Sequence, residues 1–136
     1  MSTTFSKEEK AAMKAAAAEA KAAKEGADLE EACLVAIAAM TGTDKDLAET
    51  LHRLVKRHTD LTSKTWYGMP AYVNADGKVV VFFQPAAKFK TRYATIGFQA
   101  EANLDEGNVW PNAYAVTKLT AADEKWLAAL LQKAVG

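Results

Sequence analysis

The most suggestive chemistry in this sequence is a run of alternating basic and aromatic residues, Lys88-Phe89-Lys90-Thr91-Arg92-Tyr93. If the run is a strand, Lys88, Lys90 and Arg92 share one face of a sheet, because side chains alternate along a strand. Three aligned cations repel one another unless an anion or a carboxylate lies against them. An ordinary amphipathic strand facing solvent explains the same pattern, so a site for a small anionic ligand is a hypothesis to be tested.

Aromatic and apolar residues elsewhere in the chain would form the rim of such a site. The further residues that the hypothesis assigns to ligand binding are Trp66, Tyr67, Met69 and Trp110. Flat rings beside cations could stack on a ring of the ligand while the cations hold its charge.

Three carboxylates, Glu101, Asp105 and Glu106, follow in a loop that contains Gly and Asn. Carboxylates close in space can bind Mg²⁺, Ca²⁺ or iron, but the spacing is not that of an EF-hand. A solvated loop is the preferred interpretation. Alternatively, the loop could fold back so that these carboxylates form ion pairs with the three cations within the same molecule.

Cysteine and histidine offer little metal chemistry. The only cysteine, Cys33, lies on an apolar helical stripe with no cation beside it, so we expect a small buried hydrophobic residue rather than a reactive thiol. His52 and His58 are six positions apart on a helix and point about 120° from one another, which prevents chelation as a pair. We expect a surface His52, a partly buried His58 and no zinc site.

Charge and motifs exclude several classes of protein. The 17 basic and 17 acidic residues give a net charge of zero, so general attraction to nucleic acid or anionic membrane is not expected. Five lysines share one side of the first helix, for which a solvated face is the preferred interpretation. No P-loop, nucleophile elbow, dinucleotide fingerprint, HExxH or CxxC occurs, so we expect no catalytic residues. No membrane-spanning stretch or signal peptide is apparent, so the expected location is the cytoplasm.

Helices are predicted before and after the strands in the sequence. Ser6 with Glu9 forms a capping-box pattern and starts an alanine-rich helix that ends near Glu25 and Gly26. A second helix starts at Asp28 and stops at Gly42. A third runs from about Asp44, with an inward face of Leu47, Leu51, Leu54, Val55 and His58. The last begins at Thr120, with Trp126, Leu127, Leu130, Leu131 and Ala134 facing inward.

Strands are predicted from the point where the hydrophobic period changes to two. Residues 71–74 and 78–84 flank Asp76-Gly77, a hairpin turn expected to need positive φ at both positions. Residues 89–98 form a third strand and 109–116 a fourth. The fold class is therefore α+β, with a mostly antiparallel sheet of four to five strands, N-terminal helices and a C-terminal helix packed against it. Residues 1–27 are expected to be an Ala/Lys-rich extension and 28–136 a single domain.

The stretch Tyr67-Gly68-Met69-Pro70 resembles the signature of the YdhG-like family, also called domain of unknown function 1801. The order of elements after it is similar too, over roughly residues 45–135. The resemblance implies a bacterial α+β domain related in fold to frataxin-like and YjbR-like proteins. Some members of the family carry the label of iron chaperone.

Three functions follow as expectations. The first is a small non-enzymatic binding or accessory protein without a cofactor, whose partner is a small anionic ligand or another protein. The resemblance implies the second, an iron chaperone-like protein, although the family's usual histidine is missing near Lys88 and the first helix carries lysines in place of an acidic ridge. The third is a nucleic-acid or phosphate binder that uses Lys88, Lys90 and Arg92.

Overall fold

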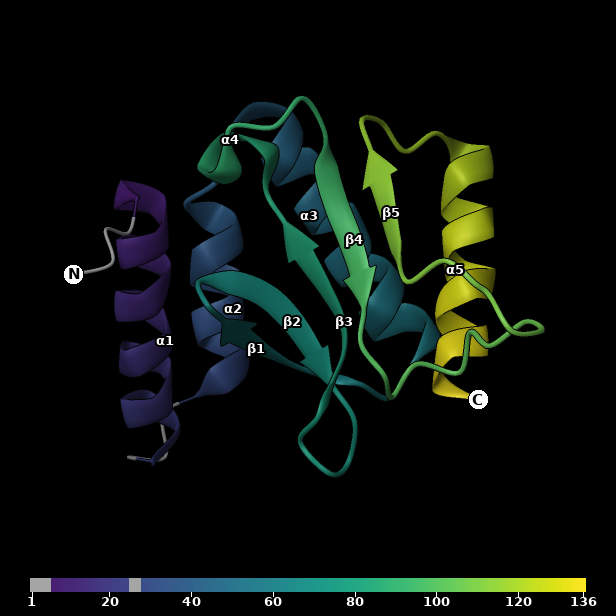
Figure 1. The fold of residues 1–136 in the computed structure, drawn as a ribbon, viewed down its shortest axis with the longest axis horizontal. Coiled ribbons are helices and arrows are strands. Elements are labelled where there is room, and N and C mark those ends of the chain that lie inside the picture. The colour runs from purple at the N-terminus through teal and green to yellow at the C-terminus, as the bar shows by residue number, and fades with distance from the viewer. Residues whose placement is uncertain (1–5, 25–27) are drawn as a thin grey trace.

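The computed structural model describes residues 6–24 and 28–136, and the side chains of 6–17 and 28–136 (Figure 1). The helices are α1 (Lys7–Lys24), α2 (Leu29–Ala38), α3 (Gly42–His58), α4 (Ala86–Phe89) and α5 (Ala121–Val135). The strands are β1 (Thr62–Trp66), β2 (Met69–Val73), β3 (Val79–Gln84), β4 (Ala94–Phe98) and β5 (Ala113–Val116). All neighbouring strands are antiparallel, in the order β1-β2-β3-β4-β5. The predicted α+β class is confirmed.

Helices α2, α3 and α5 enclose the core with one face of the sheet. In Figure 1, α2 and α3 lie behind the strands and α5 stands beside β5, while α1 stands at the outer side of α2. Helix α2 packs on β1 and β2, and α3 packs on α5. None of the helices in the described part of the chain is long and apolar enough to cross a membrane.

The core takes its side chains from three helices and four strands. Its helical members include Cys33, Ile37, Leu47, Leu51, Leu54, Val55, Leu127, Leu131 and Ala134. The strands add Tyr72, Val80, Val81, Phe83, Ala94, Ile96, Phe98 and Val116. The predicted inward faces of α3 and α5 are thus largely confirmed, and Cys33 of α2 is buried in the core as expected. Trp126 was predicted to face inward but is 47% exposed, with its ring edge-on to Tyr114 at 5.1 Å.

Side-chain caps start three helices at the predicted residues. The Glu9 amide donates to the Ser6 hydroxyl at 3.0 Å, and the Thr120–Asp123 pair forms a reciprocal capping box. Asp28 accepts from the amides of Glu30 and Glu31. The predicted helix end at Glu25 and Gly26 lies outside the described residues.

Gly42 begins α3 rather than ending α2, so its predicted role is wrong. Helix α2 ends at Ala38, where the Met40 amide donates to the Ile37 carbonyl at 3.0 Å and tightens the last turn. Gly42 then takes φ +57°, a left-handed conformation that glycine adopts without penalty. The reversal lets α3 start two residues before the predicted Asp44.

The sheet differs from prediction at its edges. Strand β1 was not predicted, because its sequence Thr-Ser-Lys-Thr-Trp is polar and has no apolar alternation. Strand β5 begins at Ala113 instead of Val109, after Pro111, which cannot donate a ladder hydrogen bond. The hairpin around Gly77 is confirmed, but only Gly77 has positive φ there. Asn74 organises the rest of the turn, because its side-chain oxygen accepts from the amides of Asp76 and Lys78.

Gly77→Val should destabilise the protein by about 1–2 kcal/mol, because a side chain at positive φ meets the following carbonyl oxygen. Gly77 has φ +77°, and a Cβ there meets no atom within 4 Å, so backbone strain alone acts. Urea unfolding at 25 °C measures the loss. Gly77→Asn is the matched control and should lose less, since Asn tolerates this conformation. Equal losses in the two variants would contradict the explanation.

Removal of residues 1–25 should leave cooperative unfolding intact and shift the thermal midpoint by no more than about 5 °C. Helix α1 lies against the domain through small side chains such as Ala15, near Gly68, and through a Glu8–Lys90 ion pair of 3.1 Å. Such contacts stabilise little, and about 1 kcal/mol corresponds to a few degrees in a domain of this size. Calorimetry of the truncated chain would reveal a broad, non-cooperative transition if α1 belonged to the core.

Candidate functional site

The basic-aromatic run is not a strand, which corrects the geometry on which the anion-site hypothesis rested. Residues 86–89 form the short helix α4, Lys90 has φ +56°, and β4 begins only at Ala94. Pro85 occupies the N-cap position of α4. The carboxylate of Asp44 on α3 accepts from the Ala86 amide at 2.9 Å and from the Ala87 amide at 3.0 Å. These two hydrogen bonds hold the segment as a helical turn.

The three cations of the run consequently diverge. Lys88 Nζ donates to the Tyr67 carbonyl at 3.2 Å. Lys90 Nζ pairs with Glu8 on α1 at 3.1 Å. The Arg92 guanidinium lies 5.3 Å from the centre of the adjacent Tyr93 ring. The predicted shared face of three cations is therefore wrong.

The predicted carboxylate partners of these cations are also wrong. Glu101 approaches Lys78 at 3.8 Å, and Glu106 approaches Lys133 at 3.8 Å. The described residues contain no group of three or more His, Cys, Asp or Glu side chains arranged to hold a metal ion. Glu101, Asp105 and Glu106 thus do not form a carboxylate site with one another.

Four of the predicted site residues meet at the hairpin turn between β1 and β2. Trp66 pairs with Met69 across the strands, so Tyr67 and Gly68 form a two-residue turn with φ +53° and +79°. Positive φ at both positions matches the twist of the flanking strands. The Trp66 and Tyr67 rings contact edge to face at 5.2 Å, and Lys88 reaches the Tyr67 carbonyl.

Trp110, the remaining aromatic residue of the predicted site, lies at the other end of the sheet. In an antiparallel meander the β1–β2 turn and the β3–β4 connection share one end, and the β4–β5 loop lies at the opposite end. Trp110 precedes Asn112, whose carbonyl accepts from the Phe98 amide at 2.7 Å at the end of β4. Trp110 therefore cannot form a rim with Trp66 and Tyr67.

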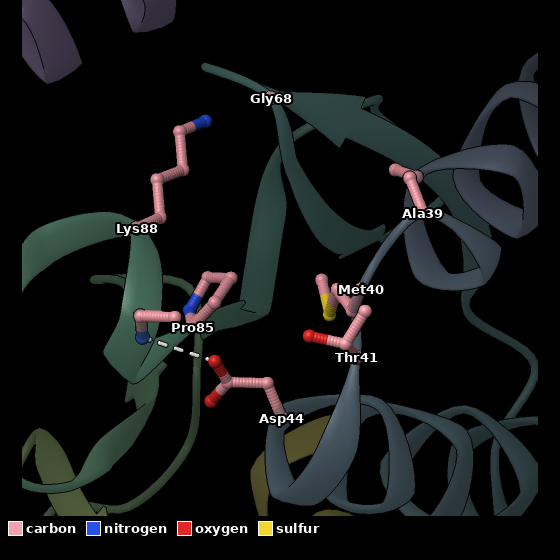
Figure 2. A pocket seen from close by; sticks show the side chains of 9 residues that line it. Ala39, Met40, Thr41, Asp44, Gly68, Pro85 and Lys88 are labelled. Atoms are coloured by element: carbon pink, nitrogen blue, oxygen red, sulfur yellow. Dashed lines mark hydrogen bonds between the residues drawn. The ribbon is translucent and has the colours of Figure 1, made fainter.

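A groove of about 340 Å³ opens beside the β1–β2 turn, and we call it the Lys88 groove (Figure 2). Its lining comes from the end of α2, the start of α3, the β1–β2 turn and α4: Ala36, Ala39, Met40, Thr41, Asp44, Gly68, Pro85, Ala87 and Lys88. Figure 2 shows Met40 and Thr41 facing Pro85 across the gap, with Lys88 extending along its rim toward Gly68. Small and apolar side chains thus make up most of the lining, together with one ammonium group, one carboxylate and one hydroxyl.

Because Gly68 has no side chain, it leaves the space that the Lys88 ammonium occupies. A Cβ at position 68 would clash with Lys88 Nζ, and the positive φ there is strained for any other L-residue. The sequence signature Tyr67-Gly68-Met69-Pro70 therefore has a structural reason in the turn and a second effect at the groove.

Asp44 is the functional residue that sequence reasoning missed. It is only 8% exposed, and it lines both the Lys88 groove and a second groove of about 390 Å³ beside Arg92. Its two oxygens are engaged by α4 amides, so it acts as a structural acceptor. The only sequence signal was an acidic residue in a first helical turn, which the helix dipole already explains.

A buried polar chain crosses the core on the helical side of the sheet. The Tyr72 hydroxyl forms a hydrogen bond of 3.0 Å with His52 Nδ1, and it also bonds the Cys33 thiol. Burial raises the pKa of Cys33 to about 11 and raises the pKa of Tyr72 above its usual range. Cys33 is thus the buried, unreactive thiol that the sequence predicted.

His52 is not a surface residue, which corrects its predicted position. Its side chain is 15% exposed, and its Nε2 lies 3.7 Å from Glu30, which also pairs with Lys56 at 3.0 Å. Burial lowers the pKa of His52, and Lys56 acts in the same direction while Glu30 opposes both. His58 is half-buried, as predicted.

Comparison of this chain with family models, with curated proteins and with solved structures finds no match.

The free energy of unfolding should fall as the pH is lowered from 7.5 to 5.5, in part because of His52. Its pKa is lowered in the folded state, so the unfolded chain binds the extra proton first, near the ordinary value of about 6.5. The contribution of the neutral His52 imidazole to the free energy of unfolding is complete above that pH. It is lost as the pH falls toward the lowered pKa of the folded state.

Urea unfolding across this range compares the wild-type protein with His52→Gln, which cannot titrate but can still form a hydrogen bond with Tyr72. His52→Gln should show a shallower decline than the wild type. Identical slopes in the wild type and His52→Gln would rule His52 out as the source.

Proposed function

We propose that this protein is a non-enzymatic binding protein whose Lys88 groove holds a small ligand with an apolar body and one anionic group, such as a short-chain carboxylate. The observation that supports this function best is the position of the Lys88 ammonium. It stands at the rim of a largely apolar groove, and no carboxylate of the described residues forms an ion pair with it. Small-molecule sites typically combine an apolar lining with a few such polar groups.

The chemistry of the groove favours a monoanion with a hydrocarbon part. An ammonium carries three donors, and the contact with the Tyr67 carbonyl uses one of them. The Ala36, Ala39, Met40 and Pro85 side chains offer apolar surface, and Met adapts its shape to irregular ligands. Asp44 disfavours a second negative charge on the α3 side. A ligand with its anionic group at Lys88 and its apolar part against Met40 and Pro85 satisfies both features.

Family membership in the YdhG-like group remains part of this proposal and rests on the Tyr67-Gly68-Met69-Pro70 resemblance. An accessory or binding role in that group agrees with a groove whose carboxylate, Asp44, already accepts two backbone hydrogen bonds. The iron alternative gains no support from the described side chains, since they offer no cluster of ligands. The nucleic-acid alternative depended on three aligned cations, and that alignment is wrong.

Hexanoate is the probe that tests the function, with hexanol as its neutral counterpart. We expect Lys88→Met to weaken hexanoate binding by about tenfold or more, because a charge-assisted hydrogen bond contributes about 1.5–3 kcal/mol. Hexanol should bind both proteins equally and more weakly than hexanoate binds the wild type. Isothermal titration calorimetry measures all four affinities.

Lys90→Met is the matched control for this experiment. It removes a cation two residues away that pairs with Glu8 and does not line the groove, so hexanoate affinity should stay within about twofold of the wild type. The proposal fails if Lys88→Met and Lys90→Met bind hexanoate alike, or if hexanoate binds the wild type no better than hexanol.

A further inference from the structure

Another groove, of about 480 Å³, lies between α3 and α5, and we call it the helix groove. Its rim carries the donor side chains Arg53, Arg57, His58, Lys125 and Gln132. Its apolar lining consists of Leu54 together with Ala121, Ala128 and Ala129. One carboxylate, Glu124, is also present in this lining.

That carboxylate is already engaged. Arg53 donates to Glu124 at 2.8 Å, which neutralises both groups and fixes the guanidinium. Arg57 and Lys125 are exposed and take part in no ion pair among the described residues. The helix groove therefore carries two uncompensated cations in a protein whose net charge is zero.

Helix structure alone does not account for this arrangement. Arg57 in the last turn of α3 is favoured by the helix dipole, but Lys125 stands near the start of α5, where a cation gains nothing from it. Arg53 and Arg57 are one helical turn apart on α3, about 6 Å along the axis. The Arg57 guanidinium on α3 and the Lys125 ammonium on α5 line the same groove, so they can reach neighbouring phosphates of one chain, and a guanidinium fork binds phosphate oxygens in pairs.

We propose that the helix groove is a binding site for a di- or triphosphate group. It is separate from the Lys88 groove, which shares none of its lining residues, so this proposal does not depend on the proposed function. The phosphates lie against Arg57 and Lys125, while the alanine side chains of α5 leave room for whatever the group is attached to.

Sodium tripolyphosphate is the probe, titrated into the full-length protein by calorimetry at low ionic strength. The double variant Arg57→Gln/Lys125→Gln should bind it at least tenfold more weakly than the wild type. The control Lys10→Gln/Lys14→Gln removes the same charge from exposed positions on α1 and should change the affinity by less than twofold. Equal losses in the two double variants would show attraction by net charge alone and overturn the site.

Glu124→Gln provides an independent test, because it removes the carboxylate without removing a donor. Affinity for tripolyphosphate should rise several-fold, since Arg53 is released for the ligand. Unchanged or weaker binding would contradict the proposal. Thermal midpoints of all variants, measured in parallel, confirm that the fold is retained, as expected for exposed or half-buried positions.

Two further titrations identify the source of the group. Binding of ATP at least as tight as that of tripolyphosphate would assign the site to a nucleotide, and weaker binding would assign it to a free polyphosphate. If poly-L-glutamate binds through Arg57 and Lys125 while tripolyphosphate does not, the groove recognises an acidic protein segment and the phosphate proposal is wrong.

Discussion

The contact between Asp44 and the start of α4 determines the arrangement of the candidate site. Asp44 follows the α2–α3 connection, and its carboxylate binds two amides more than 40 residues away in sequence. The carboxylate is almost fully buried, so loss of either partner would leave a polar group without compensation, at a cost of about 1–3 kcal/mol. By fixing residues 86–89 as a helical turn, the contact directs Lys88 toward the β1–β2 hairpin and separates it from Lys90 and Arg92.

The elements that could be predicted are those in which a local pattern and the tertiary structure agree. The caps at Ser6, Asp28 and Thr120 are properties of a few neighbouring residues. The apolar stripes of α3 and α5 face the core and bury Leu51 and Leu131 there, as their helical spacing predicts. The hairpin at Gly77 was predictable for the same reason, since a positive φ is a local requirement.

The candidate site could be predicted only in part, because its geometry depends on contacts between distant residues. Alternation of charged and aromatic residues in 88–93 is equally compatible with a strand and with a turn of helix followed by a left-handed residue. Hydrogen bonds from the Asp44 carboxylate select the helical turn. Asp44 is more than 40 residues away, so the local sequence pattern of residues 88–93 does not include it. Trp66, Tyr67, Met69 and Lys88 nevertheless lie near one another, because the Tyr67-Gly68 turn places the first three together and Lys88 reaches the turn. The prediction that Trp110 lies beside Trp66 and Tyr67 was wrong, because an aromatic residue in the sequence does not indicate at which end of the sheet its loop lies.

Because the protein has no net charge, ligand selection at the two proposed grooves depends on short-range contacts. With no net charge there is little long-range steering, and at about 0.1 M salt the field of a single ammonium is screened within about 10 Å. Selection of a ligand must therefore come from contacts made inside each groove. In the Lys88 groove that means an apolar fit beside a single ammonium, and in the helix groove it means the Arg57 and Lys125 side chains, which come from two different helices. One cation beside apolar surface discriminates by the hydrocarbon part of a ligand. A cluster of donors discriminates by the number and spacing of its anionic groups, so the two sites would accept different ligands even though both attract negative charge.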